Sequence, residues 1–255
     1  MRDVIYYKDE LNDEFSEAKI IPRKIDGKYV YIHKNPIWKF CAFVVQNILS
    51  MPIKFFYVKF KFKIKYIGKE KLEKYKNDGY FVYVNHTQPF ADTFIPTLPI
   101  YPKENFFIVN PENVSMKYLK TLVEMLGALP IPCDKEGMRN FLDAIENKVN
   151  KKCSITIYPE AHIWPYYTKI RNFKSVSFKY PIKYNKPSFC MTNTYVKDEK
   201  RKGKVKIETY IDGPFFADEK LPLKERQQDL RDRIYNCMVK RSKNSNIEVI
   251  KYIKK

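Results

Sequence analysis

Two loops carry residues suited to acid–base chemistry, and the first surrounds His86. This polar loop runs from Asn85 to Asp92 and directly follows the apolar residues 80–84. A carboxylate six residues further on can fold back onto the imidazole, fix its tautomer and leave the other ring nitrogen as a general base. The sequence therefore predicts His86 as base and Asp92 as its partner. The competing interpretations are a structural histidine and a helix N-cap at Asp92.

The second loop follows residues 154–158 and reads Pro-Glu-Ala-His-Ile-Trp-Pro from position 159. Glu160 is either a substrate ligand or a solvated loop carboxylate, and His162 is a second candidate base. A third segment, residues 126–135, is a short strand that turns into a helix with Lys135 at its beginning. All three places join a strand to a loop or helix, as sites in open α/β sheets do.

Strands alternating with helices must position these loops. The pattern predicts strands at 80–84, 106–109, 154–158, 189–195 and 205–211, and helices at 92–97, 115–126, 135–150 and 223–240. Asp134 suits an N-cap for the third helix, and residues 197–204 suit an exposed turn. We therefore expect one α/β domain with a mixed, mostly parallel sheet flanked by helices. No repeat or low-complexity linker divides the chain.

Residues 36–60 differ from the rest because they are apolar and aromatic. The uncharged run 40–53 has 14 residues, fewer than the about 20 that a spanning helix needs. It predicts a helix lying in a membrane interface or, alternatively, one packed on the domain. Residues 59–66 alternate lysine with apolar residues and predict a strand with a basic face. We place the N-terminal interfacial region at 1–58 and the α/β domain at 59–255. The candidate membrane contacts are aromatic: Trp38, Phe40, Phe43, Phe55, Phe56 and Tyr57.

The charge is strongly positive, since 48 Lys+Arg face 29 Asp+Glu for a net of +19. Nine lysines and two glutamates fall between Lys54 and Lys76, a local net of +7. Such an excess favours an anionic surface, although a lysine-rich codon bias would also produce it. No helix-turn-helix, RNP-like or zinc pattern accompanies the charge, so an anionic membrane is favoured over nucleic acid.

The sequence lacks the residue patterns of several common enzyme classes. None of the seven glycines forms a glycine-rich phosphate loop, and there is no G-x-S-x-G nucleophile elbow. The three histidines are more than fifty residues apart and the five cysteines form no C-x-x-C, so we expect no metal and a reducing compartment. The charged N-terminus does not suit a signal peptide.

Taken together, four blocks are similar to those of a known family. They are Asn85-His86 with Asp92; residues 127–134, Gly-Ala-Leu-Pro-Ile-Pro-Cys-Asp; Tyr158-Pro-Glu-Ala-His162 followed by Arg171-Asn-Phe-Lys174; and, loosely, residues 186–191. In this order and spacing the chain resembles the 1-acylglycerol-3-phosphate acyltransferase family of glycerophospholipid acyltransferases. The resemblance runs from about residue 60 to 240.

Two departures from the family pattern matter. Five residues separate His86 from Asp92 where the family has four, which on a helix would turn the carboxylate about 100° away; a bulge next to Pro89 would absorb the extra residue. The third block lacks the family's glycine and its arginine, which would bind an acceptor phosphate. Its replacement is open among five cations: Lys135, Arg139, Lys169, Arg171 and Lys174.

The resemblance implies a reaction. A fatty acyl thioester, on coenzyme A or acyl carrier protein, would donate its acyl group to a lysophospholipid hydroxyl, 1-acylglycerol-3-phosphate being favoured. His86 would remove the hydroxyl proton, Asp92 would orient the imidazole, and Glu160 would bind the acceptor or hold the loop. Backbone amides near the Pro-Glu loop would hold the oxyanion. No cofactor is implied, and the expected location is the cytoplasmic face of the membrane, peripheral or monotopic. The alternatives are another acceptor hydroxyl, on a glycolipid or envelope lipid, and a non-catalytic lipid-binding relative.

Overall fold

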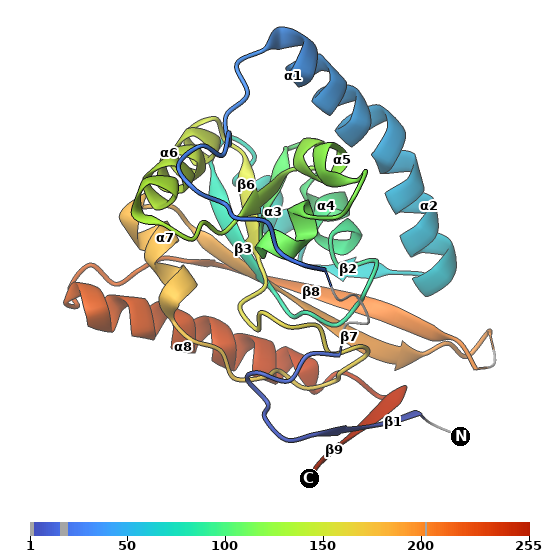
Figure 1. Ribbon diagram of the computed structural model, residues 1–255. Coiled ribbons are helices and arrows are strands. Elements are labelled where there is room, and N and C mark those ends of the chain that lie inside the picture. The colour runs from blue at the N-terminus through green and yellow to red at the C-terminus, as the bar shows by residue number, and fades with distance from the viewer. Residues whose placement is uncertain (1–2, 16–19, 202) are drawn as a thin grey trace.

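A seven-stranded sheet forms the centre of the molecule (Figure 1). The computed structural model describes residues 3–15, 20–201 and 203–255. The strand order is β2-β8-β7-β3-β6-β4-β5, and every neighbouring pair is parallel except β7 with β8. The mixed, mostly parallel sheet expected from the sequence is confirmed. The strands are β2 (Lys65–Ile67), β3 (Tyr80–Val84), β4 (Asn105–Val109), β5 (Ala128–Pro130), β6 (Ser154–Ile157), β7 (Ser188–Lys197) and β8 (Val205–Phe215).

Helices cover both faces of this sheet, as the apolar central strands require. Side chains alternate along β3, so that Phe81 and Tyr83 join the core beneath α6 and α8, while Val82 and Val84 face α3 and α4. The helices of the domain are α3 (Glu70–Glu73), α4 (Phe94–Ile100), α5 (Lys120–Met125), α6 (Lys135–Asn150), α7 (Lys179–Lys183) and α8 (Leu223–Ser242), with 3-10 turns η2 (Pro111–Val114) and η3 (Val176–Phe178).

The predicted elements are found with shifted ends. The helix expected at 135–150 has these bounds, and Asp134 caps it by accepting from the backbone N–H of Gly137 at 2.7 Å. The helix expected at 92–97 begins two residues later, and the one expected at 115–126 is helical only from Lys120. The turn at 197–204 joins β7 to β8, as expected, but Asp198 within it is buried.

Asp212 on β8 ties three elements together. Its carboxylate accepts from Lys71 of α3 at 2.8 Å and from Arg241 of α8 at 2.7 and 2.8 Å. Burial raises the pKa of this carboxyl, but the bonds from Arg241 and Lys71 outweigh burial and hold the pKa at about 2. The charged form of Asp212 therefore stabilises the fold at neutral pH.

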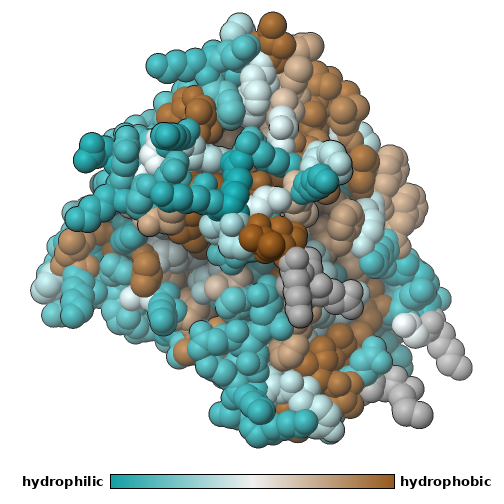
Figure 2. Space-filling view, viewed as in Figure 1, coloured by the Kyte–Doolittle hydropathy of each residue, from teal (hydrophilic) through white to brown (hydrophobic). Residues whose placement is uncertain are grey.

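The N-terminal apolar segment is one helix of 27 residues, Pro36–Phe62. It consists of α1 (Pro36–Phe43), a π-helical stretch η1 (Val44–Leu49) and α2 (Ser50–Phe62). By length and composition it could cross a membrane, and 11% of its most apolar 18-residue window is buried. Figure 2 shows hydrophobic side chains gathered along the edge of the molecule where this helix runs in Figure 1.

The strand predicted for residues 59–66 is wrong over most of its length. Residues 59–62 end α2, and only Lys65–Ile67 is a strand. Val58 and Phe62, one helical turn apart, are buried against Ala91 and Ile95. The period of 3.6 therefore prevails over the local alternation of lysine with apolar residues because packing on α4 selects it.

The two ends of the chain meet beneath the sheet. β1 (Asp3–Tyr7) pairs in parallel with β9 (Ile250–Lys254), and both lie at the opposite end of the molecule from α1 (Figure 1). Ile25 and Tyr31 of the N-terminal region belong to the main core. The predicted boundary after residue 58 falls inside α2, and the division into 1–58 and 59–255 stays a prediction.

Candidate active site

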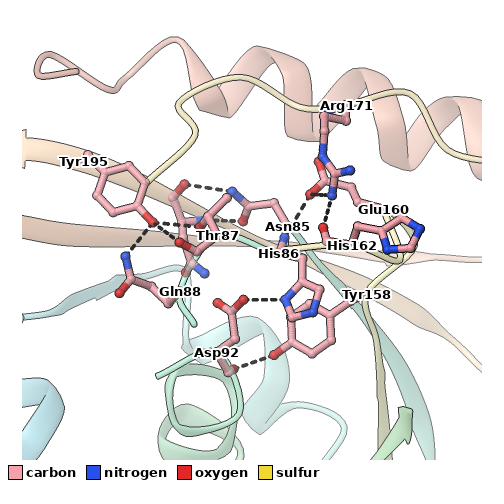
Figure 3. Close-up of polar contacts among 11 residues, drawn as sticks. Asn85, His86, Thr87, Gln88, Asp92, Tyr158, Glu160, His162, Arg171 and Tyr195 are labelled. Atoms are coloured by element: carbon pink, nitrogen blue, oxygen red, sulfur yellow. Dashed lines mark hydrogen bonds and ion pairs between the residues drawn. The ribbon is translucent and has the colours of Figure 1, made fainter. Parts of the chain in front are cut away.

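His86 and Asp92 form a close pair. Nδ1 of His86 lies 2.5 Å from Oδ2 of Asp92 (Figure 3). The Asp92 side chain is 4% exposed and that of His86 is 18% exposed. With Nδ1 engaged by the carboxylate, Nε2 is left for another partner. A carboxylate in this position can hold an imidazole in one tautomer and leave its other nitrogen able to accept a proton.

The extra residue between them is taken up by a turn. The backbone N–H of Asp92 donates to the carbonyl of Gln88 at 3.3 Å, and that of Ile95 donates to the carbonyl of Ala91 at 2.9 Å. Residues 88–92 thus make one i to i+4 turn before α4 begins, which returns the Asp92 carboxylate to the imidazole. Asp92 is not the N-cap of α4, since Thr93 occupies that position without a side-chain capping bond.

Side chains from neighbouring strands fix the loop after β3. Asn85 is buried and exchanges two bonds with the backbone of Asn193 on β7, at 2.8 and 3.1 Å. The Tyr195 hydroxyl donates to Thr87 Oγ1 at 2.7 Å and accepts from Gln88 Nε2 at 2.9 Å. His86 is therefore flanked on both sides by anchored residues, which limits its motion.

Glu160 holds the backbone of His86 from the second loop. Its Oε2 accepts from the His86 N–H at 2.9 Å, and its Oε1 accepts from the Arg171 N–H at 2.9 Å. The Arg171 guanidinium lies 3.6 Å from the same carboxylate, and both side chains are 1% exposed. The bond from the His86 N–H to Glu160 joins the two loops predicted from the sequence, and the buried ion pair with Arg171 holds Glu160 in place. Glu160 is not a solvated loop carboxylate.

Tyr158 and Trp164 complete the surroundings of the imidazole. The Tyr158 ring stacks on His86 with centroids 4.4 Å apart, and its hydroxyl donates to the Asp92 carbonyl. The backbone N–H of Trp164 donates to the His86 carbonyl at 3.1 Å. Neither residue was among the predicted site residues. Tyr158 stands next to the Pro-Glu pair in sequence, but nothing in the sequence indicates the stacking.

Burial raises the pKa values of both carboxyls in this cluster. For Asp92, the hydrogen bond and charge of His86 oppose the effect of burial, and for Glu160 the Arg171 charge does so. A buried carboxylate gains most when its neighbour becomes positive. The position of Asp92 would therefore favour a positive charge on the neighbouring imidazole ring.

A cavity of about 310 Å³ opens beside His86 at the carboxyl ends of β3, β4 and β6. Its walls are largely apolar and include Ile108, Ile131 and Ile157. Asn110, Asn113 and Lys174 add polar groups. The volume is at the lower end for small-molecule sites. An apolar chain with a polar, anionic head would match this lining.

The other predicted cations lie outside the cavity lining. Lys135, Arg139 and Lys169 are exposed and do not line it, and Arg171 is buried against Glu160. Lys174 is exposed and, among the described residues, is the one lysine or arginine that lines this cavity.

His162 lies apart from the pair. Its Nδ1 is 3.4 Å from the Glu14 carboxylate, and its carbonyl accepts from Arg171. The amides expected to hold an oxyanion near the Pro-Glu loop are partly used, because those of Ala161 and His162 bond to carbonyls of the same turn. The substrate-binding roles assigned to Glu160 and His162 remain predictions.

The predicted membrane contacts divide into two groups. Phe40, Phe43, Phe55 and Phe56 are exposed by 45–68%. Trp38 and Tyr57 are half-buried: Trp38 stacks on His33 at 3.6 Å, and Tyr57 packs edge-on against Phe90 and Phe94.

One group of described residues has the composition of a metal site. Ligand atoms of Cys190, Asp212 and Cys237 lie within 4.8 Å of one another. The Asp212 carboxylate is already bonded to Lys71 and Arg241, whose charges oppose a cation there. The cluster is therefore poorly suited to a metal ion.

Comparisons with known proteins agree with this geometry. Residues 63–188 match the model of the acyltransferase family. The fold is similar to that of the 1-acyl-sn-glycerophosphate acyltransferase PlsC from Thermotoga maritima, with a TM-score of 0.52 and 16% identity over 84% of this chain and 85% of that one. No curated protein matches the chain in sequence. The matched segment contains the His86–Asp92 pair, Glu160 and the site cavity's Lys174, which confirms the resemblance drawn from the four blocks. Residues 63–188 of this chain therefore match the acyltransferase family.

Proposed function

We propose that this enzyme transfers a fatty acyl group from a thioester donor, acyl-CoA or acyl carrier protein, to a hydroxyl of a lysophospholipid such as 1-acylglycerol-3-phosphate. The observation that carries the proposal is the His86–Asp92 pair at an apolar cavity whose polar part includes Lys174. The similar fold of PlsC, a 1-acyl-sn-glycerophosphate acyltransferase, supports this acceptor.

The reaction needs two proton transfers and one acyl transfer. Nε2 of His86 removes the proton from the acceptor hydroxyl while its oxygen attacks the thioester carbonyl. Asp92 stabilises the resulting imidazolium, which returns the proton as the thiol leaves. A dyad of this kind contributes roughly 10²–10⁴-fold to the rate. Because the acceptor oxygen attacks the thioester directly, no acyl-enzyme is required, and the apolar cavity walls would hold the acyl chain.

Lys174 is our candidate for the phosphate contact that the family assigns to an arginine of the third block. That arginine is replaced, and Arg171 is committed to Glu160. An ammonium group at the cavity edge binds a phosphate through charge and one or more hydrogen bonds.

The test measures thiol release from acyl-CoA with purified protein and lysophosphatidate in mixed micelles. His86→Ala should abolish turnover. Lys174→Ala should raise KM for lysophosphatidate about tenfold or more with a smaller effect on kcat, whereas Lys179→Ala, an exposed lysine nearby, should change neither. Full activity of His86→Ala would overturn the mechanism.

The replaced third-block residues also favour a second candidate, the same transfer to a glycolipid or other envelope hydroxyl. A panel of monoacylglycerol, glycolipid and lysophosphatidate acceptors separates the two. Strict dependence on the phosphate group would exclude the second candidate. Turnover above the His86→Ala background would exclude a non-catalytic lipid-binding role.

We also infer that the exposed face of α1–α2 docks on the cytoplasmic surface of an anionic membrane. Phe40, Phe56 and Phe60 are more than half exposed on a helix whose last turn carries Lys59 and Lys61. Phe40→Ser/Phe56→Ser should reduce flotation with phosphatidylglycerol vesicles. Equal binding by this variant and the parent would contradict the inference. Preference for duplex DNA over these vesicles at ~150 mM salt would indicate nucleic acid as the anionic partner.

A further inference from the structure

A second cavity, of about 380 Å³, lies between α1–η1 and the body of the domain. Its lining includes Glu104 and Phe106 at the start of β4 and Ala128 at the start of β5. His86 follows the carboxyl end of β3, which runs parallel to these strands through β6. The second cavity therefore lies at the amino ends of the parallel strands and the site cavity at their carboxyl ends, and the two share no lining residue.

Positive charge is concentrated in this second cavity. Four lysines and two glutamates line it, and one glutamate, Glu124, is bonded to Arg23 and Tyr29 at 3.0 Å each. Burial lowers the pKa of Lys148, the Glu104 carboxylate opposes this effect, and the nearby ammonium groups of Lys151 and Lys39 lower the pKa by smaller amounts. Three like charges that repel one another in a partly buried place favour an anion among them.

The Phe106 ring holds the Lys148 side chain in position and leaves the ammonium hydrogens for a ligand. Its Nζ lies 4.0 Å from the ring centroid of Phe106. The adjacent thiol, Cys153, stays neutral because burial raises its pKa to about 12. Cys153 therefore adds no negative charge to balance the lysines.

An unused polar atom lies in the same wall. Oδ1 of Asn147 is buried and has no hydrogen-bond partner among the described residues, and Asn147 lines the cavity. A buried acceptor without a partner costs free energy. A hydroxyl group near the anionic head, such as that of a lysophospholipid glycerol, would satisfy it.

The rest of the wall is apolar and leads to the exposed helix. Trp38, Ala42 and Phe43 contribute from α1, and Met125 and Leu129 contribute from α5 and β5. The Phe43 side chain is 54% exposed, so it reaches both the cavity and the outer apolar face of the helix. An acyl chain leaving the cavity along α1 would stay in contact with apolar surface.

We propose that this second cavity binds the head of a single-chain lipid anion, with a carboxylate or phosphate between Lys39, Lys148 and Lys151 and its chain along α1. The ligand is a free fatty acid or a lysophospholipid. This site is separate from the catalytic pair, and the proposal does not depend on the acceptor assigned above.

Photo-crosslinking with diazirine-labelled palmitate and lysophosphatidate tests the proposal on the full-length protein. Labels should map to residues 32–46 and 147–153 in both the parent and the His86→Ala variant. Lys148→Met keeps the aliphatic stem over Phe106, and Lys148→Met/Lys151→Met should weaken labelling about tenfold or more. Lys224→Met, an exposed lysine on α8, serves as the matched control.

The two probes distinguish the sources of the anion. Stronger labelling by palmitate indicates that the site prefers a carboxylate, and stronger labelling by lysophosphatidate indicates a phosphate. Inorganic phosphate at roughly 10 mM should then compete with lysophosphatidate, because an isolated head group binds weakly. The proposal is overturned if the lysine substitutions leave the extent of labelling unchanged, or if the labels map only beside His86. Unchanged thermal unfolding of each variant verifies that it is folded.

Discussion

The amide substitution Asp92→Asn isolates what the carboxylate contributes. The side chain keeps its size, but its oxygen and nitrogen now compete for His86 Nδ1. If the amide nitrogen donates to Nδ1, the imidazole proton moves to Nε2, and Nε2 can no longer accept a proton from the acceptor. The negative charge that stabilises the imidazolium is lost in the same step.

The structure sets the expected size of the effect. The Nδ1–Oδ2 separation of 2.5 Å and the burial of Asp92 mean that water cannot easily replace the carboxylate. We therefore expect kcat to fall by roughly 10²–10⁴-fold, the range of general acid–base catalysis. KM for the acyl donor should change little, because Asp92 does not line the site cavity.

Stability should respond differently from activity. Because burial raises the pKa of Asp92, the fold bears a cost for the buried charge that a neutral amide does not carry. The unfolding midpoint of Asp92→Asn should equal or exceed that of the parent.

The assay is initial-rate thiol release with saturating lysophosphatidate, combined with thermal unfolding of the same samples. Asp143→Asn, on the exposed face of α6, is the matched control and should leave both quantities unchanged. A kcat for Asp92→Asn within about threefold of the parent would refute the role of the pair, since even the low end of the expected effect is near 10².

Three further outcomes follow from single contacts. Arg171→Met should lower the free energy of unfolding by about 3 kcal/mol, measured in urea, because Glu160 stays buried without its cation; adding Glu160→Gln should recover part of the loss, and additive losses would contradict the pairing. Asp212→Asn should lower the free energy of unfolding by roughly 2 kcal/mol at pH 7. Because the folded pKa of about 2 is below the unfolded value, the difference in unfolding free energy between parent and variant should shrink as the pH falls from 4 towards 2. A constant difference from pH 7 to pH 3 would contradict the role of the charge. Asp134→Ala should cost about 1 kcal/mol through loss of the cap bond to Gly137, and urea unfolding equal to that of the parent would show that the cap is dispensable.

Sequence patterns predicted secondary structure best where a segment carried a single hydrophobic period. The helix 135–150 carries a cap, a uniform apolar stripe and no competing period, and its bounds agree with the sequence. The strands 80–84 and 154–157 are short, apolar and bounded by polar loops, which is why their existence was predictable. Residues 59–66 carried two periods at once, and contact with α4 decided between them.

Contacts between distant segments were beyond the sequence. The partnership of Glu160 with Arg171 joins residues eleven positions apart through a turn whose path no periodicity describes. The stacking of Tyr158 on His86 joins residues 72 positions apart and depends on β3 and β6 being neighbours. Residues 3–7 showed no strand signal that we used, and their pairing with β9 brings the two chain ends together.

By itself, the sequence pointed to the reaction class through its resemblance to a known family, because that family's blocks appear in the same order at the predicted strand ends. It also determined the alternating α/β architecture that brings those ends to one edge. Only the tertiary structure decided whether Asp92 reaches His86, since one residue turns a side chain by about 100° on a helix but a loop turn can restore it. The structure also showed that of the five candidate cations Lys174 lies at the site cavity while Arg171 is held by Glu160. Those outcomes depend on burial and on which strands are neighbours, and neither is written in local spacing.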